Sequence, residues 1–437
     1  MSRQNRPDIR TFGCRINIWE SEVMRRHAEA AGLNDVVVVN TCAVTAEAEK
    51  QARQEIRKIK RERPDARIIA TGCAVQIDPD NWASLPQVDG VLGNQDKMLS
   101  DTWSSLAADR LAPHQVSSIM EAEEVASHLL DGFDDHTRGF LQVQQGCDHR
   151  CTFCIIPYGR GNSRSVPSED VIAAVRKMVS GGTREIVLSG VDITSWGADL
   201  PGRPRLGQLV LAVLDAVPEL PRLRLSSLDP AEPDHYLMTA LETHARLMPH
   251  LHLSVQHGDD LILKRMKRRH LARDVHRFCE EARRRRPDVV FGADLIAGFP
   301  TETEQAHQNS LELITTAGLT HLHVFGYSPR SGTPAANMPQ LDRAVIKQRV
   351  AEIKAAGDRQ LAAHLAGRIG TSDMLLVEAG AKGYLSGYEK ARLATGQAAE
   401  LADQIKPGAL VAVQIESADD GLVHVSPLRR EQPSRSL

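Results

Sequence analysis

The chain has 437 residues, of which 42% are hydrophobic and 25% are charged, and its formal net charge is −3. These values are ordinary for globular proteins, so they exclude global disorder, and the length predicts two to four domains. The sequence contains no run of eighteen apolar residues and no apolar signal core at its N-terminus, so we expect neither a membrane span nor secretion, and predict a cytoplasmic protein.

The first hundred residues alternate between short extended runs and helical patterns. The second helical pattern begins after Thr45, a good N-cap, and carries glutamates in its first turn. This alternation predicts an open α/β domain with a parallel sheet over residues 5–115, followed by an acidic linker over 116–137. The extended runs are 9–13, 36–41 and 67–72, and the helical patterns are 17–32 and 45–63.

A longer alternation of six strand and helix units begins at residue 138. It predicts a partial (βα)6 parallel barrel over 138–368, with its site at the carboxyl ends of the strands. Short β-like runs over 369–430 predict a small antiparallel β-barrel or sandwich, and the polar tail 431–437 is predicted to be disordered. The predicted barrel strands are 139–145, 184–190, 222–227, 251–256, 289–298 and 321–328.

Three cysteines follow the three predicted strands of the N-terminal domain. Cys14, Cys42 and Cys73 are separated by 28 and 31 residues, which is about the length of one βα unit. This spacing predicts three thiols at the carboxyl edge of one sheet, where open α/β sheets hold their ligands. Each cysteine could instead be a small buried hydrophobe, but chance burial does not select the same strand end three times.

A second cysteine triad follows the first predicted barrel strand. Cys147, Cys151 and Cys154 have the spacing C-x₃-C-x₂-C on one short loop. A structural zinc site needs four ligands, whereas three thiolates on a four-iron cluster leave one iron open for another ligand. We therefore favour an iron–sulfur cluster, and keep zinc as the alternative.

The second triad, at the end of the first strand of a partial βα barrel, resembles that of the radical S-adenosylmethionine enzymes. In that superfamily the open iron chelates S-adenosylmethionine, and one electron from the cluster yields a 5′-deoxyadenosyl radical that abstracts hydrogen. The N-terminal triad narrows the resemblance to the methylthiotransferases, over residues 9 to about 365, and the last sixty residues more loosely resemble the TRAM-like RNA-binding barrel that ends these enzymes. The matching segments are TFGCRINIWESE, VVNTCAVTAEAEKQARQ, ATGCA, GFLQVQQGCDHRCTFCIIPYGRGNSRS, GADLIAGFPTETE and HVFGYSPRSGTPAA.

Within this family the sequence looks most like the branch that acts on threonylcarbamoyl-adenosine in tRNA. The resemblance implies two [4Fe-4S] clusters, and S-adenosylmethionine used both as methyl donor and as radical source. It also implies a tRNA substrate, a flavodoxin- or ferredoxin-like electron donor and a source of sulfur. The alternatives are the branches acting on isopentenyl-adenosine in tRNA or on a ribosomal protein and, from another class, a zinc-stabilised RNA-binding protein.

Further candidate residues lie beyond the cysteines. Small and polar residues at barrel strand ends are predicted to contact the cofactor, because they allow close approach or bind ribose and carboxylate groups. Arg160 and Arg164, just after the cysteine loop, are predicted to bind phosphate or the threonyl carboxylate. Basic clusters at 50–63, 263–270 and 282–287 are candidate phosphate contacts, or simply solvated helix faces. The predicted cofactor contacts are Gly190, Ser226, Ser227, Gln256 and Gly298.

Overall fold

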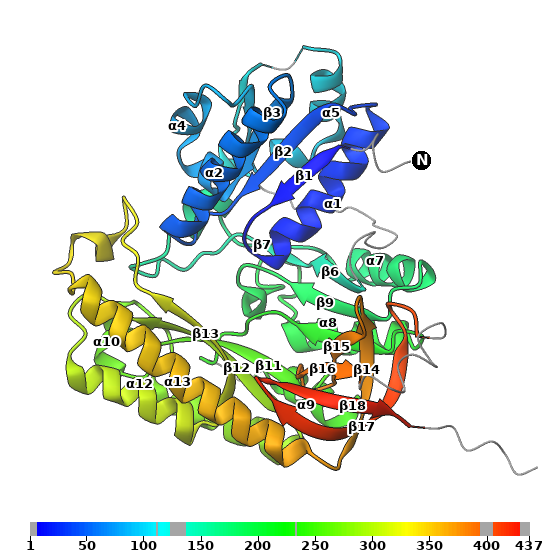
Figure 1. The fold of residues 1–437 in the computed structure, drawn as a ribbon, viewed down its shortest axis with the longest axis vertical. Helices are drawn as coiled ribbons and strands as arrows, with labels where there is room; N and C mark the ends of the chain where they lie inside the picture. The colour runs from blue at the N-terminus through cyan, green and yellow to red at the C-terminus, as the bar shows by residue number, and fades with distance from the viewer. Residues whose placement is uncertain (1–6, 111, 123–136, 232–233, 394–404, 429–437) are drawn as a thin grey trace, which may run out of the picture.

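Three β-structures follow one another along the chain: an open parallel sheet, a partial parallel barrel and a small closed barrel (Figure 1). The computed structural model describes residues 7–110, 112–122, 137–231, 234–393 and 405–428. Most of the predicted linker 116–137 and all of the predicted tail 431–437 lie outside the described residues. This architecture confirms the predicted fold class, while the exact domain boundaries stay predictions.

The N-terminal sheet is parallel throughout, in the order β1-β2-β3-β4-β5. The central strand β2 has the sequence VVVVNT and is buried along its whole length, because β-branched side chains pack well on a covered sheet. Its strands are β1 (Asp8–Thr11), β2 (Val36–Thr41), β3 (Arg67–Gly72), β4 (Gly90–Leu92) and β5 (His114–Gln115). The helices of this unit are α1 (Arg15–Ala30), α2 (Ala46–Glu62), α3 (Cys73–Ile77), α4 (Pro79–Ala83) and α5 (Ser100–Ala107).

The first three strands were predicted, and β4 and β5 were not. These two strands have three and two residues, which is too short to show any hydrophobic period. The predicted N-cap of α2 is confirmed, since the Thr45 hydroxyl accepts a hydrogen bond from the Ala48 amide at 3.2 Å.

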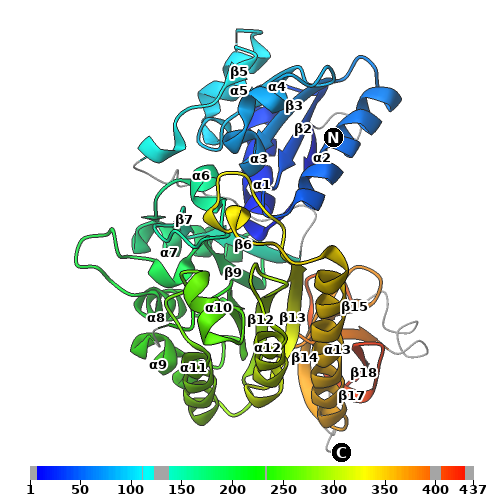
Figure 2. The ribbon, with the colours of Figure 1, turned by 90° about the vertical axis from the view of Figure 1, so that its left-hand side faces the viewer.

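The middle unit has six parallel strands, as predicted. Two three-stranded sheets, β10-β9-β6 and β11-β12-β13, are joined by parallel bridges from Leu223 to Leu247 and from Leu228 to Leu253. The strands are β6 (Arg138–Gln142), β9 (Glu185–Ser189), β10 (Arg222–Leu225), β11 (His250–Gln256), β12 (Val290–Ala297) and β13 (Leu319–Gly326). Helices on the outer side of this unit cover one face of its strands with an apolar core (Figure 2). The helices that contribute to this core are α7 (Ser168–Ser180), α8 (Leu206–Ala216), α9 (His235–Thr243), α11 (Ala272–Arg285), α12 (Glu304–Thr316) and α13 (Arg343–Arg368), whereas the short helix α10 (Asp260–Arg265) belongs through Ile262 to a separate apolar cluster.

The first predicted barrel strand is divided in two. β6 stays in the barrel, whereas β7 (Gln144–Gln145) turns away and pairs antiparallel with β8 (Arg164–Ser165). This short ladder closes the base of the segment that carries the second cysteine triad and helix α6 (Ile156–Arg160). The cysteine loop is therefore anchored at both of its ends.

The C-terminal unit is a closed barrel, in the strand order β14-β15-β16-β18-β17. It docks on the middle unit through Arg222 and Arg224, which are buried beside Glu185 and donate hydrogen bonds to backbone carbonyls of the barrel, including Leu385 at 2.8 Å. Its strands are β14 (Ser372–Glu378), β15 (Lys382–Tyr384), β16 (Lys390–Leu393), β17 (Leu410–Asp419) and β18 (Leu422–Pro427).

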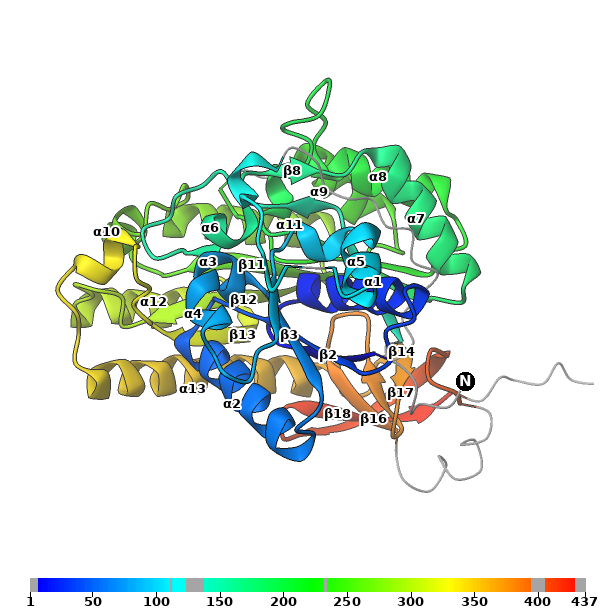
Figure 3. The same cartoon turned by 90° about the horizontal axis from the view of Figure 1, so that it is seen from above.

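Seen from above, the N-terminal sheet lies over the strands of the middle unit (Figure 3). Residues at or just beyond the carboxyl ends of β2, β11 and β13 line one cavity, so these strand ends lie at the junction of the two units. None of the helices in the described ranges has both the length and the apolar composition that crossing a membrane requires.

Candidate active site

The N-terminal cysteines lie where the spacing of the βα units predicts. Cys14 is the N-cap of α1 after β1, Cys42 follows β2 and Cys73 opens α3 after β3. The three strands are adjacent and parallel, so the thiols share one sheet edge. Gly13, at φ +96°, passes so close to Cys42 that a Cβ on it would come within 2.7 Å of the Cys42 sulfur. Glycine is needed there, both for its backbone conformation and for this close approach.

The spacing of the thiols favours a cluster over a single zinc ion. Four sulfurs around one zinc, with Zn–S bonds of about 2.3 Å, lie about 3.8 Å apart. Within the described part of the chain, the one group of three potential metal ligands whose donor atoms all lie within 4.8 Å of one another is His252, Asp294 and His323, which contains no cysteine. Both cysteine triads are more widely spaced, as expected where each thiolate binds a different iron.

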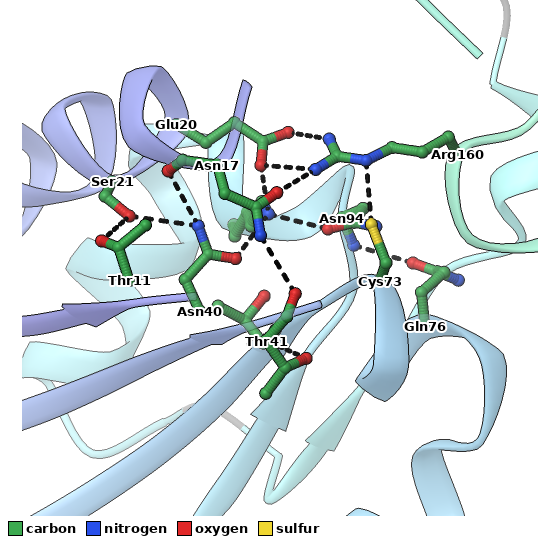
Figure 4. Close-up of polar contacts among 12 residues, drawn as sticks. Thr11, Asn17, Glu20, Ser21, Asn40, Thr41, Cys73, Gln76, Asn94 and Arg160 are labelled. Atoms are coloured by element: carbon green, nitrogen blue, oxygen red, sulfur yellow. Dashed lines mark hydrogen bonds and ion pairs between the residues drawn. The ribbon is translucent and has the colours of Figure 1, made fainter. Parts of the chain in front are cut away.

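A buried polar network surrounds the N-terminal triad (Figure 4). Arg160, which is only 1% exposed, donates a hydrogen bond from Nε to the Cys73 sulfur at 3.0 Å. Its two terminal nitrogens donate to Glu20 and Asn17 on α1. Asn17 in turn donates to the carbonyls of Phe12 and Thr41, at 2.6 and 3.1 Å. One arginine from the cysteine loop of the middle unit therefore connects the ends of β1, β2 and β3.

Lys97 completes this network. Its ammonium group has three acceptors, Glu20 at 2.7 Å, Asn94 at 2.7 Å and Asn40 at 3.3 Å, which match its three N–H donors. Burial lowers the pKa of Lys97, and Glu20 opposes that shift. Burial would likewise lower the pKa of Arg160, but Cys73 and Glu20 raise it well above its ordinary value.

The network contains two cations and one carboxylate, so one positive charge has no carboxylate counterpart. That excess charge is directed at Cys73 through the Nε–H of Arg160. A buried charge needs a partner, and thiolates or an anionic cluster on the triad would supply it. The residues present therefore fit an iron–sulfur cluster at this edge of the sheet.

The second triad lies on the loop between β7 and α6. At its start, Gly146 at φ +73° runs so close to Asn162 that a Cβ would come within 1.9 Å of the Asn162 carbonyl oxygen, so only glycine fits there. Burial, then Asp192, raises the pKa of Cys147 to about 12, and burial raises that of Cys154 to about 11. These thiols stay protonated at neutral pH until a metal binds and displaces their protons.

The five predicted cofactor contacts lie at the carboxyl ends of adjacent strands. Gly190 follows β9 and Ser226 follows β10, and the Ser226 hydroxyl accepts a hydrogen bond from the Gly190 amide at 3.4 Å. Ser227 donates to Asp294 at 3.3 Å. Gln256 ends β11 at φ +71°, and Gly298 follows β12. Their roles as cofactor ligands stay predictions, because proximity to the strand ends does not identify a ligand.

A cavity of about 270 Å³ lies at the junction of the two units. Val44 and Thr45 line it from the N-terminal unit, two and three residues beyond Cys42, and Phe153 lines it from the cysteine loop. The barrel contributes Gln256 and Asp294, together with Ile296 and 325–328. Loops from both cysteine triads therefore border the same cavity, which we take as the candidate active site.

The structure places the two predicted substrate arginines away from this cavity. The donors of Arg160 are occupied by Glu20, Asn17 and Cys73, and Arg164 is buried and donates to the carbonyls of Ala122 and Arg160, both at 3.1 Å. Neither guanidinium is presented to an incoming phosphate or carboxylate. The sequence interpretation assigned these arginines to substrate because they follow the cysteine loop, and that position alone does not show the direction of the side chain.

Several residues of the site were not predicted. Asn17 and Glu20 lie three residues apart on α1, and therefore on the same face of the helix as buried apolar residues. A polar pair on such a face is the one feature of the sequence that could have indicated a buried polar network. Asp294, Phe153 and Phe325 gave no such signal, because each lies in an ordinary strand or loop pattern.

Comparison with known proteins identifies the same two parts. Residues 141–314 match the Radical SAM superfamily, and residues 6–93 match the uncharacterized protein family UPF0004. Among solved structures, the radical S-adenosylmethionine methyltransferase TsrM from Kitasatospora setae has a TM-score of 0.54 at 14% identity, covering 74% of this chain and 66% of that protein. This likeness concerns the fold.

Curated relatives extend over most of the chain. The threonylcarbamoyladenosine tRNA methylthiotransferase MtaB of Rickettsia prowazekii is 49% identical over 86% of this chain and 89% of its own length. The protein of the same name from Thermotoga maritima is 39% identical, over 76% of each chain. The tRNA-2-methylthio-N(6)-dimethylallyladenosine synthase of Paracoccus denitrificans is 34% identical, over 85% of each chain. Identity at this level and coverage confirms the resemblance carried by the cysteine motifs: the chain belongs to the radical S-adenosylmethionine methylthiotransferase family.

Proposed function

We propose that the protein is a tRNA methylthiotransferase that converts N(6)-threonylcarbamoyladenosine next to the anticodon to its 2-methylthio derivative. The observation that supports this most directly is that the loop after Cys42 and the loop that carries the second triad border one cavity, although they come from separate sheets. The chain is 49% and 39% identical to two relatives named for threonylcarbamoyladenosine, and 34% identical to one named for dimethylallyladenosine. This difference favours threonylcarbamoyladenosine as the substrate base.

Two sets of cysteines would each bind one iron–sulfur cluster. Cys147, Cys151 and Cys154 would hold the [4Fe-4S] cluster that binds S-adenosylmethionine, and the N-terminal triad would hold the second cluster. When bound, these groups supply one-electron cleavage of S-adenosylmethionine and a site for the transferred sulfur. The adenine must leave the stacked anticodon loop to bring its C2 into the cavity, where Phe153 and Phe325 offer apolar surface that excludes water.

The basic clusters differ in what they can offer to RNA. In 282–287, Arg285 pairs with Glu281 and Glu242, and Arg286 pairs with Asp288 and donates to backbone carbonyls, so this cluster is largely structural. On α2, by contrast, Arg57, Lys58 and Arg61 are exposed. We propose α2 as a phosphate-contacting face for the tRNA. We also propose that a flavodoxin- or ferredoxin-like protein reduces the clusters, that a separate source supplies the sulfur, and that the protein acts in the cytoplasm.

The substrate is tested by mass spectrometry of nucleosides from tRNA of cells with and without the gene. We expect the 2-methylthio derivative of threonylcarbamoyladenosine to disappear, and to return when the gene is restored. Loss of the methylthio mark from isopentenyl-adenosine would instead support the other tRNA branch. Unchanged tRNA would contradict the proposed substrate.

Arg160 should tune the N-terminal cluster through its charge. In a chain whose second triad is replaced by alanine, Arg160→Gln removes the cation 3.0 Å from Cys73, so reduction, which adds negative charge, becomes harder and the midpoint potential shifts to more negative values. Arg160→Lys keeps the charge and should shift the potential much less. A redox titration followed by electron paramagnetic resonance measures both, and equal potentials in all three proteins would contradict this role.

A further inference from the structure

Two histidines and an aspartate converge on the inner face of the barrel, outside both cysteine triads. His252 is on β11, Asp294 on β12 and His323 on β13, three adjacent parallel strands. Their neighbours Leu253 and Ala293 belong to the apolar core beneath the helices. Because side chains alternate along a strand, His252 and Asp294 point to the opposite face, into the barrel. His323 is paired in register with Asp294.

The donor atoms have the spacing of ligands around one metal ion. Asp294 Oδ1 lies 3.0 Å from His252 Nε2 and 3.1 Å from His323 Nδ1, and all three donor atoms lie within 4.8 Å of one another. Two ligands with metal bonds of about 2.1 Å are about 3.4 Å apart around a tetrahedral zinc ion and about 3.0 Å apart at the right angles of an octahedral site. The three side chains can therefore occupy adjacent coordination positions with little movement.

The surroundings hold these side chains in place. Ser227 donates to the second carboxylate oxygen of Asp294 at 3.3 Å, which leaves Oδ1 to the two imidazoles. Gly292, the register partner of His252, makes room for its ring, because a Cβ there would come within 2.4 Å of Nδ1. Supporting hydrogen bonds and restricted ring orientation are general features of metal ligands.

The group lies between two cavities. Asp294 lines the candidate active-site cavity, while His252 and His323 line a neighbouring cavity of about 220 Å³ that extends to Tyr388 of the C-terminal barrel. The His252 side chain is buried, whereas that of His323 is 58% exposed. An ion bound here would be reached through these cavities and would keep open positions toward them.

We propose that His252, Asp294 and His323 form a binding site for one divalent transition-metal ion of the zinc class, separate from both cysteine triads. Two imidazoles and one carboxylate suit zinc and iron(II), and three protein ligands leave positions open for water or for an oxygen of a bound molecule. The competing interpretation is a hydrogen-bonded triad, in which both imidazoles donate to one carboxylate oxygen.

Zinc binding by the holoenzyme distinguishes the two interpretations. The anaerobic protein, with its cysteines occupied by clusters, is incubated with zinc chloride and desalted, and its metals are measured by mass spectrometry. We expect about one zinc per chain in the wild type, and at least a tenfold loss of zinc affinity in Asp294→Asn and in His323→Ala. His321→Ala is the matched control: His321 lies on the same strand and is not part of the group, so this variant should retain zinc.

X-ray absorption at the zinc edge supplies a readout independent of stoichiometry. The proposal requires nitrogen and oxygen neighbours at about 2.0–2.1 Å, without sulfur at about 2.3 Å. Sulfur neighbours would assign the zinc to thiols, and a wild type that retains no more zinc than Asp294→Asn would leave only the hydrogen-bonded triad. Either result overturns the proposal.

Discussion

Replacing Cys147, Cys151 and Cys154 together by alanine should lower the iron content of the holoenzyme from about eight to about four atoms per chain. It should also abolish methylthiolation, because the remaining triad lies on a different sheet and cannot take the place of the one on the barrel loop. Iron and sulfide are measured after anaerobic reconstitution, and product is measured by mass spectrometry of the tRNA.

A variant of the N-terminal triad and a control cysteine variant test whether the loss of iron is specific to each triad. Alanine at Cys14, Cys42 and Cys73 should likewise remove about four irons, from the other site. Cys279 is fully buried on α11, where burial raises its pKa to about 12, so Cys279→Ala should keep the full iron content. Wild-type protein with about four irons would indicate one functional cluster, and zinc in place of iron would favour the RNA-binding alternative.

The parts of the fold that could be predicted are those that repeat. Strands such as β2 and β3 have bounds identical to the predicted runs, because a buried parallel strand shows in the sequence as a mostly apolar segment between two helical patterns. The same repeat put Cys14, Cys42 and Cys73 at one sheet edge, as predicted. In contrast, β4 and β5 are strands because they pair with neighbouring strands, and each is too short to show a hydrophobic period in the sequence.

The contacts of the site were less predictable, because they join distant parts of the chain. Arg160 and Glu20 are 140 residues apart, and no local pattern indicates that one is the partner of the other. The group of His252, Asp294 and His323 requires the register of three strands, whereas the sequence shows only alternation within each. Strand ends could therefore be predicted, while the direction and partner of each polar side chain could not.

Glu20→Gln should destabilise the protein by about 3–5 kcal/mol, although it preserves the shape of the side chain. Glu20 is completely buried and is the carboxylate that Arg160 and Lys97 share. Neutralising it leaves two buried cations next to each other without that partner. The free energy of unfolding is measured from denaturant titrations followed by tryptophan fluorescence, to which Trp19 and Trp103 of the same unit contribute.

The pH dependence of this variant identifies the cause. Without Glu20, Lys97 is the cation that can lose its proton, so its pKa in the folded state should fall further below the unfolded value of about 10.4. The unfolded chain then binds more protons than the folded one, and stability must rise as pH increases from 7 toward 9. Glu47→Gln, which removes an exposed pair with Lys50, should change stability by less than about 0.5 kcal/mol and show no such slope. If Glu20→Gln lowers the free energy of unfolding by less than about 1 kcal/mol, then water or the thiol groups, rather than Glu20, stabilise the two buried cations.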